Sequence, residues 1–366
     1  MSTTFKILIA AILIAVIGIM SIYSSASRKE GELWETLCQR QMIWVALGLL
    51  AFWFFFKFNY RWLWDWTYFI YGVVVFLLSL VFILGIVRLG AQRWLNLVWF
   101  NFQPSEIAKL ITIMFLAKYF SMKSVDDVAL KASKFGLWRA LILPFIFVAI
   151  PVFLIIEQPD LGSGAIVFMI FFIMLYLSNV KLRFIIIFLA LLGLAIPVGW
   201  NFLRDYQKDR IMVFLNPNID PLGAGYTVIQ SKIAIGSGGF FGKGWLSGTQ
   251  SQLKFLPESH TDFIFATFSE EWGFLGAVIL IGLYFFIIQQ GIRIAERTSD
   301  HYGKLLALGI TLMLGMQTCV NISMNMGLAP VVGLPLPLMS YGGSSVIVTF
   351  IALGILANVS KTRAVF

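Results

Sequence analysis

The chain has 366 residues, of which 59% are hydrophobic and only 12% are charged, and its formal net charge at pH 7 is +9. A soluble domain has about 25% charged residues, so this composition excludes an ordinary soluble fold and predicts a polytopic membrane protein. The positive charges fall mainly in short segments between apolar runs, which is typical of membrane topology and not of nucleic-acid binding.

The apolar runs predict the helices, because a spanning helix needs about 20 mainly apolar residues. The first run is longer than the apolar core of a secretory signal, so we interpret it as a retained helix. One gap, 204–262, is far longer than the others. We therefore predict an all-α protein with a single transmembrane domain over 1–366 and ten spanning helices, at 5–24, 40–57, 66–87, 105–121, 139–156, 163–178, 182–203, 263–290, 303–326 and 341–359.

The distribution of Lys and Arg predicts the orientation. These residues are more numerous in the loops that share a side with the N-terminus, so we expect both termini in the cytoplasm and the 204–262 loop outside. The basic run 118–139 fits the same bias, with binding of anionic lipid or of a cytoplasmic partner as the alternative. Most of the unusual polar groups fall on the outer side, and a site for a cytosolic nucleotide is therefore not expected.

The segment before and into the fourth predicted helix is unusually polar. Glu106 and Lys109 are three residues apart and share one helix face, either as a local ion pair or as part of a polar cavity for an anionic substrate. Arg93 could bind phosphate through its planar fork of donors. Trp94 could stack on a sugar or anchor the chain at the membrane interface. Asp160, in "EQPDLGSG", lies on another outer loop.

The long outer loop contains one further amphipathic pattern. Residues 226–235 predict an interfacial helix. The glycine-rich stretch 236–248 matches neither a dinucleotide fingerprint nor a P-loop, although its amides could still cradle a phosphate; otherwise it is a flexible loop. Lys232 and Lys243 are the cations of this region that we take as candidates for binding an anionic substrate.

The stretch "LPESHTDFIFATFSEEWG" gathers acids at the mouth of the eighth predicted helix. Asp262 could cap that helix, because a carboxylate there accepts unpaired N–H groups, or it could be a reacting acid. On a continuous helix Glu270 would lie about 12 Å deeper. An acid at that depth should face protein or water, either in a structural ion pair or holding the cations of a site. Glu271 would point to nearly the opposite side.

The cysteines and histidines do not indicate a metal site. Cys38 and Cys319 are far apart and lie within or beside apolar segments, so we interpret them as small buried residues. Neither histidine has a Cys or His at ligand spacing. We therefore expect no zinc, and no haem or nucleotide cofactor.

Several motifs occur in an order that resembles one known family. They are "QRWLNL", "FQPSEIAK", "QPDLGS", "DPLGAGY", "HTDFIFA" and "NISMNMGLAPVVGLPLPLMSYGGSS". Together they resemble the SEDS proteins (shape, elongation, division and sporulation) over roughly residues 89–359. Within that family, "GLPLPLMSYGG" and "GTQSQLKFLPE" are more similar to the elongation branch than to the division branch.

The resemblance implies an activity and a location. It implies a peptidoglycan glycosyltransferase that polymerises lipid II into β-1,4 glycan strands on the outer face of the bacterial cytoplasmic (inner) membrane, during cell elongation and shape maintenance. The implied ligands are lipid II, undecaprenyl-pyrophosphate-linked glycan and membrane lipid, and the implied partner is a class B penicillin-binding transpeptidase. A lipid II flippase and a non-catalytic scaffold for that transpeptidase are the alternatives.

The resemblance also implies roles for residues. The family's essential aspartate matches Asp262, and its polar pair on the fourth helix matches Glu106 and Lys109. Asp262 could be a general base for the attacking hydroxyl, or it could hold a divalent cation (Mg or Mn) that stabilises the leaving pyrophosphate. The other residues that we assign to the substrate cavity are Arg93, Trp94, Asp160, Lys232, Lys243, Glu270 and Ser344.

Overall fold

The computed structural model of the chain describes residues 3–26, 33–88, 91–97, 101–124, 141–178, 180, 182–201, 203–221, 223 and 225–361. The fold is mostly helical, and a helix occupies each of the ten ranges predicted above. Bounds differ by a few residues at most ends. The long helices are α1 (Thr3–Ala26), α2 (Leu33–Lys57), α3 (Arg61–Leu84), α4 (Pro104–Ser124), α5 (Leu143–Glu157), α6 (Leu161–Leu177), α7 (Leu182–Trp200), α11 (Ile264–Glu296), α12 (His301–Asn325) and α13 (Gly343–Lys361).

Six of these helices are long and apolar enough to cross a membrane by length and composition. They are α1, most of α2, and α3, α11, α12 and α13. Helices α5 and α6, and the Leu182–Leu194 part of α7, are apolar but shorter. Helix α4 has 21 residues but carries several charged side chains. The protein is therefore a multi-pass membrane protein, and the crossing of all ten helices stays a prediction.

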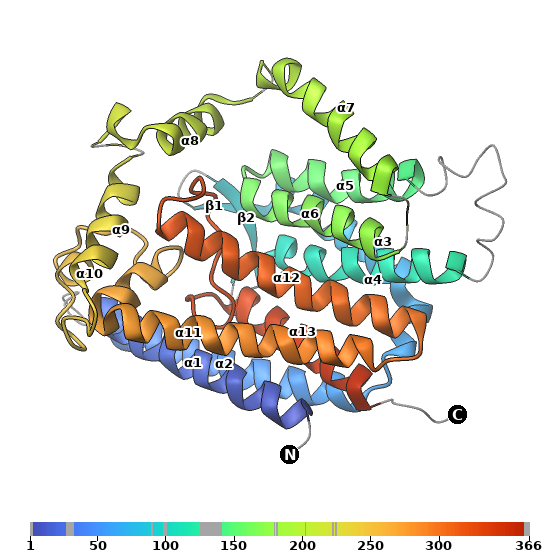
Figure 1. Cartoon of the computed structure of the whole chain (residues 1–366), viewed down its shortest axis with the longest axis horizontal. Coiled ribbons are helices and arrows are strands. Elements are labelled where there is room, and N and C mark those ends of the chain that lie inside the picture. Colours follow the sequence, from blue (N-terminus) through green and yellow to red (C-terminus); the bar gives the residue numbers. More distant parts are fainter. Residues whose placement is uncertain are drawn as a thin grey trace.

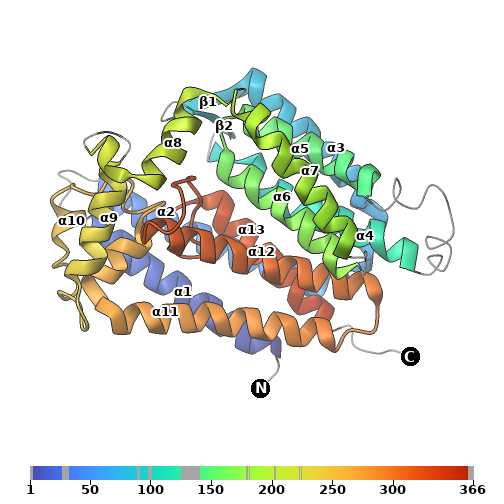
Figure 2. The ribbon, with the colours of Figure 1, turned by 45° about the horizontal axis from the view of Figure 1, so that its top comes forward.

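The central helices lie roughly parallel to one another (Figure 1). Helix α12 contacts α11, α4 and α6, and α13 contacts α2 along most of its length. The buried core between them is apolar and aromatic, with Phe115, Phe171 and Phe350 fully enclosed. Helix α7 lies along one side of the bundle, and the chain then passes through α8 towards α9 and α11 (Figure 2).

The prediction of a helix over 66–87 is wrong at its end, because α3 stops at Leu84 and a hairpin follows. The hairpin is formed by β1 (Gly85–Arg88) and β2 (Ala91–Asn96), and β3 (Asn101–Phe102) extends it to three antiparallel strands. The side-chain amide of Gln92 donates hydrogen bonds to the carbonyls of Val81, Phe82 and Gly85. These carbonyls lie at the end of α3, where the Val81 carbonyl also accepts a hydrogen bond from the backbone N–H of Gly85. Gln92 therefore links the helix end to the hairpin.

The 204–262 loop contains more regular structure than the sequence suggested. The predicted helix at 226–235 is confirmed as α9 (Tyr226–Ser237), whereas α8 (Asp205–Leu215), a 3-10 turn η2 (Pro217–Ile219) and the short α10 (Thr249–Gln252) were not predicted. The predicted basic run 118–139 lies largely outside the described residues, which resume at 141.

Helix α11 is interrupted at Gly273, where φ is 64° and ψ is −163°. At this break the amides of Lys243 and Gly244 donate to the carbonyls of Glu270 and Glu271, each at 3.0 Å. A Cβ on Gly242 would lie 2.1 Å from the Glu271 carbonyl oxygen, so only glycine permits this approach. The glycine-rich stretch is therefore bound to α11, and the prediction that its amides cradle a phosphate is wrong for residues 243 and 244.

Candidate functional site

Asp262 lies in a turn whose backbone is hydrogen-bonded to α12 and to the segment before α13. Its backbone carbonyl accepts hydrogen bonds from the side-chain amides of Asn321 and Asn325, both at 3.0 Å. These asparagines are four residues apart on α12 and so share one face. The neighbouring carbonyl of Thr261 accepts a hydrogen bond from the Ser340 hydroxyl. The position of Asp262 is therefore set by α12 and by the segment before α13.

The Asp262 carboxylate is not a helix cap. Helix α11 begins at Ile264, its N-cap residue is Phe263, and no side chain makes a capping hydrogen bond there. Since Asp262 precedes the helix, the depth and angle expected between it and Glu270 on a continuous helix do not apply. Burial, and next the negative charge of Glu258, raise the pKa of Asp262 to about 6, although Arg93 and Arg210 oppose this shift. A carboxyl with a pKa near neutrality is suited to accept a proton.

Arg93, on the hairpin, acts electrostatically on this carboxylate. In the β1–β2 pairing, Gln92 lies opposite Val87 and Trp94 lies opposite Ile86, so Arg93 is the additional residue of a β-bulge. A bulge re-aims the side chain that it carries. The Arg93 guanidinium donates to the carbonyls of Gln158 and Pro159.

Arg93 and Asp262 border one small space beside Gly333. A Cβ on Gly333 would lie 3.5 Å from Asp262 Oδ2 and 3.8 Å from Arg93 Nη1. The φ of Gly333 is 68°, a conformation that other residues rarely adopt. Glycine here thus serves two purposes: it permits the turn and it leaves the space between the carboxylate and the guanidinium open.

Asp160 connects this pair to α4. Its Oδ1 lies 4.0 Å from Arg93 Nη1 and accepts a hydrogen bond from the backbone N–H of Ser163, so Asp160 is also the N-cap of α6. Its Oδ2 accepts hydrogen bonds from Ser105 Oγ and Gln103 Nε2. Asp160 therefore holds Arg93 in place and has little free capacity for a ligand.

Ser344 joins the same hydrogen-bond network through Gln103. Its hydroxyl accepts a hydrogen bond from the backbone N–H of Gln103 at 3.0 Å and donates to the carbonyl of Asn101. This joins the start of α13 to the turn before α4. Ser344 thus stabilises the backbone next to the predicted cavity. Its contact with substrate stays a prediction.

Arg210 is a member of the site that the sequence analysis did not identify. It lies on α8 and is half-buried, and its Nη1 is buried without a hydrogen-bond partner in the described part of the chain. Burial lowers the pKa of Arg210, and the like charge of Arg93 lowers it further, while Asp262 acts in the opposite direction. The only sequence signal was an arginine in the long 204–262 loop, since nothing local indicates that Arg210 lies within electrostatic range of Asp262. We call Asp262, Arg93, Arg210, Asp160 and Glu258 the Asp262 site.

Glu106 and Lys109 form the predicted ion pair. Lys109 Nζ lies 2.6 Å from Glu106 Oε1, and the two side chains are 1% and 3% exposed, respectively. The adjacent residue, Ser105, contacts Asp160 directly. The pair therefore lies one residue from the network of the Asp262 site, and its predicted role in binding substrate stays a prediction.

Glu270 belongs to a different cluster. Its fully buried carboxylate lies 2.6 Å from Lys243 Nζ and accepts hydrogen bonds from the backbone amides of Thr249 and Gln250. The structural ion pair considered for Glu270 is thus observed, with Lys243 as the cation. Glu271 is also buried and accepts a hydrogen bond from the Ser24 hydroxyl of α1. Both glutamates join the outer loop and α1 to α11.

The remaining two predicted residues lie at the edges. Trp94 is half-buried in β2, opposite Ile86. Lys232, on α9, covers the turn after α12: a Cβ on Gly327 would lie 2.6 Å from its Nζ. The neighbouring Ser231 hydroxyl donates to the Asn325 carbonyl. Contacts of Trp94 and Lys232 with substrate stay predictions.

The chain is similar to a known protein family and to curated relatives. The chain matches the family described as cell cycle proteins, comprising FtsW, RodA and SpoVE, over residues 3–365. It is 45% identical over 296 residues to the peptidoglycan glycosyltransferase MrdB of Escherichia coli (strain K12), and this match covers 81% of the chain and 78% of that protein.

Two solved structures resemble the whole chain. One is a chain of a peptidoglycan synthase complex, described as showing the structural coordination of polymerization and crosslinking. Its TM-score is 0.83 at 32% sequence identity, and the match covers 99% of this chain and 98% of that chain. The other is the rod shape determining protein RodA of Thermus thermophilus, with a TM-score of 0.70 at 29% identity and with 98% and 97% covered.

Proposed function

The chain belongs to the FtsW, RodA and SpoVE family of cell cycle proteins, and we propose that it is a peptidoglycan glycosyltransferase that polymerises lipid II into β-1,4 glycan strands. The observation that carries this proposal is that Asp262 and Arg93 border one open space at Gly333. A glycosyl transfer from a lipid pyrophosphate needs a group to accept a proton and cations to receive the leaving phosphates. The Asp262 site has both.

Asp262 is the proposed general base. The attacking sugar hydroxyl forms a bond to the anomeric carbon of the donor, and the bond from that carbon to the pyrophosphate oxygen breaks. The hydroxyl proton passes to the Asp262 carboxylate, and the electron pair of the broken bond leaves with the pyrophosphate. A single in-line displacement inverts the anomeric centre, so an α-linked donor gives a β-1,4 strand.

Arg93 and Arg210 are the proposed receptors of the pyrophosphate. A guanidinium matches phosphate oxygens with two parallel N–H donors. Arg93 is held by the carbonyls of residues 158 and 159, so its orientation is fixed before substrate binds. Arg210 supplies a buried nitrogen that is not bonded within the described chain. This pre-organisation favours charge that develops on the leaving group.

A divalent cation, Mg or Mn, fits the site as a ligand shared with substrate. The described residues contain no group of three metal-ligating side chains. However, Mg²⁺ is often held by one or two carboxylates together with substrate phosphates, and Asp262, with Glu258 nearby, could supply the protein part. When bound, such a cation would stabilise the negative charge of the pyrophosphate.

We also propose the setting of the reaction. Ten membrane-spanning helices with cytoplasmic termini would place the 204–262 loop and the Asp262 site at the outer face of the bacterial inner membrane. The similarity to a chain of a peptidoglycan synthase complex supports a class B penicillin-binding transpeptidase as the partner. The family resemblance points to α11, α12 and the outer loop as the surface for that partner.

The test is a polymerisation assay with purified full-length protein, its transpeptidase partner and lipid II, with and without a chelator. We expect glycan chains from the wild type and none above background from Asp262→Asn. A control variant, Glu296→Gln, removes an exposed carboxylate at the end of α11 and should retain activity. Undiminished polymerisation by Asp262→Asn would overturn the assignment of the base.

The same preparation separates the alternatives. Loss of activity on chelation, with recovery on adding Mg²⁺ or Mn²⁺, supports the shared cation, and activity that is indifferent to the chelator removes it from the mechanism. Transbilayer movement of lipid II in vesicles without chain growth would instead indicate a flippase. Absence of both activities would indicate a scaffold.

A further inference from the structure

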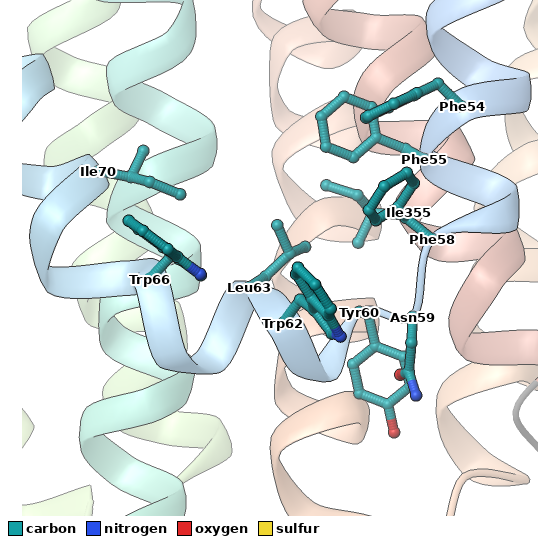
Figure 3. A pocket seen from close by; sticks show the side chains of 10 residues that line it. All are labelled: Phe54, Phe55, Phe58, Asn59, Tyr60, Trp62, Leu63, Trp66, Ile70 and Ile355. Atoms are coloured by element: carbon teal, nitrogen blue, oxygen red, sulfur yellow. The ribbon is translucent and has the colours of Figure 1, made fainter.

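A second pocket lies far from the Asp262 site, where α2 passes into α3 (Figure 3). Its volume is about 160 Å³. An apolar cavity of about 150 Å³ holds a molecule the size of benzene, so the pocket has room for a short length of hydrocarbon. Its walls are almost entirely apolar and come from α2, α3, the turn between them and α13: Phe54, Phe55, Phe58, Asn59, Tyr60, Trp62, Leu63, Trp66, Ile70 and Ile355.

The pocket is a built feature of the fold. The Asn358 side chain donates to the carbonyls of Phe56 and Phe58 and accepts a hydrogen bond from the backbone N–H of Tyr60. One amide from α13 thus satisfies the backbone groups that the break between α2 and α3 leaves without a helical partner. The break, and with it the pocket, is held in a single shape.

The open side of the pocket faces away from the bundle. The side chains of Phe54, Phe58 and Trp62 are 53%, 46% and 61% exposed. Their rings adjoin one another, with centroids 4.5 Å apart for the first two and 6.0 Å for the last two. In a membrane protein such a surface faces the lipid, and Trp62 is of the residue type that is enriched at the level of the headgroups.

Helix α12 shows that this surface is at the opposite end of the protein from Asp262. The Tyr60 hydroxyl donates to Asp300, the N-cap of α12, whereas Asn325 at the other end of α12 holds the Asp262 carbonyl. Twenty-five residues of α-helix extend about 37 Å. This exceeds the ~30 Å of a bilayer's hydrocarbon core, so the two places belong to opposite leaflets.

Three exposed cations lie at helix ends that adjoin the pocket residues in the chain or in the fold. Lys57 ends α2, Arg61 begins α3, and Lys361 ends α13 with its Nζ 5.3 Å from the centre of the Phe56 ring. The ion pairs in the described chain include none of the three. The nearby acids are Asp65, which is exposed, and Asp300, which already accepts hydrogen bonds from Tyr60 and from the backbone of Gly303.

We propose that this pocket binds an anionic phospholipid of the leaflet opposite the Asp262 site. A stretch of acyl chain occupies the aromatic pocket, and the headgroup phosphate lies among Lys57, Arg61 and Lys361. Both halves of the ligand are needed to account for the surface. An uncharged lipid would fill the pocket without using the three cations at the neighbouring helix ends, and a soluble anion would leave the hydrocarbon-sized pocket unfilled. In the proposed orientation this is the cytoplasmic leaflet, whose anionic lipids attract basic residues.

Photocrosslinking of lipids to the full-length protein tests the proposal. The protein is placed in phosphatidylcholine nanodiscs with a trace of phosphatidylglycerol or of phosphatidylcholine, each with the same diazirine-bearing acyl chain, and the labelled peptides are mapped by mass spectrometry. We expect phosphatidylglycerol to label residues 54–70 about tenfold more than phosphatidylcholine does. Equal labelling by the two lipids would overturn the proposal.

Two triple variants with the same change of charge identify the cause. Lys57→Gln, Arg61→Gln and Lys361→Gln together should abolish the preference for phosphatidylglycerol, and since all three side chains are exposed, the fold should be retained. The control, Arg293→Gln, Arg297→Gln and Lys304→Gln, neutralises three exposed cations near the α11–α12 turn, at the same end of α12, and should keep the preference. If the control loses the preference equally, general surface attraction explains the labelling and the site is rejected.

Discussion

The Asp262 carboxylate combines partial burial with neighbours of both signs. Its raised pKa has a consequence for activity, since a general base works only when it is deprotonated. The rate of polymerisation should rise with pH through about 6. Glu258→Gln removes a negative charge that raises this pKa, so the acid limb should move to lower pH. A pH–rate profile of both proteins checks this, and an unmoved limb would show that another group controls it.

The same pKa predicts how stability depends on pH. The folded state binds the Asp262 proton more tightly than the unfolded state, so the contribution of this group to stability is full below about 4 and is lost as the pH rises through about 6. Asp262→Asn should therefore melt at a higher temperature than the wild type at about pH 8, and the difference should vanish near pH 4. Thermal unfolding in one detergent at both pH values measures this. A variant that is less stable at about pH 8 would contradict it.

The open space beside Gly333 can be tested separately from the strain that its positive φ would cause in another residue. Gly333→Ala places a methyl group between Asp262 and Arg93, and we expect a loss of activity of about tenfold or more. Gly239→Ala is the matched control, because Gly239 also has a positive φ but has nothing within 4 Å of its added Cβ. Equal losses of activity in the two variants would attribute the effect to backbone strain alone.

Some residues of the site could be predicted from sequence, and the reason differs from residue to residue. The pairing of Glu106 with Lys109 follows from local helical spacing and was predicted. Asp262 was selected by family resemblance, because local pattern favoured a helix cap. Arg210 was missed, and the bulge that aims Arg93 was missed too, since both depend on contacts between segments far apart in the chain.

The ion pair on α4 illustrates what an element contributes to stability. Removing one partner of a buried pair leaves a buried charge uncompensated, so Lys109→Met should destabilise the protein by roughly 3–5 kcal/mol. The double variant Glu106→Leu with Lys109→Met removes both charges and should recover most of that loss. Unfolding by heat or denaturant measures both. If the double variant regains stability but not polymerisation, the pair belongs to the substrate cavity. If it regains both, the role of the pair is structural.

Glu270 is the side chain that attaches the segment 243–252 to α11, in addition to the backbone hydrogen bonds of Lys243 and Gly244. Glu270 binds Lys243 and the first amides of α10, and Glu270→Gln removes the charge while keeping the shape. We expect faster amide hydrogen exchange over 243–252 and little change over 226–237, which α9 covers. Unchanged exchange at 243–252 would show that the backbone hydrogen bonds around Gly273 are sufficient.

Among the secondary-structure elements, the long helices were predictable because their apolar runs are long and continuous. The hairpin was not, because strands of four and six residues within an aromatic stretch have no distinctive periodicity, and a single glutamine decides where α3 ends. The break at Gly273 was missed for a similar reason: a glycine within an apolar run gives no sign that a distant loop approaches it.

For the whole molecule, orientation is the property that still depends on charge bias. In a background of Cys38→Ser and Cys319→Ser, a cysteine at exposed Phe241 should react with a membrane-impermeant maleimide added to intact spheroplasts. A cysteine at exposed Glu296 should react only after the membrane is opened. The reverse pattern would invert the proposed topology and with it the side of the reaction.

Helix α12 has fixed points at both ends. Tyr60 holds its beginning through Asp300, and its end holds Asp262 through Asn321 and Asn325. A helix hardly changes length under load, so α12 connects these two points rigidly, and in the proposed topology they lie on opposite sides of the bilayer. We expect Tyr60→Phe, which releases the far end, to alter polymerisation although no atom near Asp262 changes, and an unaltered rate would refute this. The cell interior would then have a means of influencing wall synthesis outside without any molecule crossing the membrane.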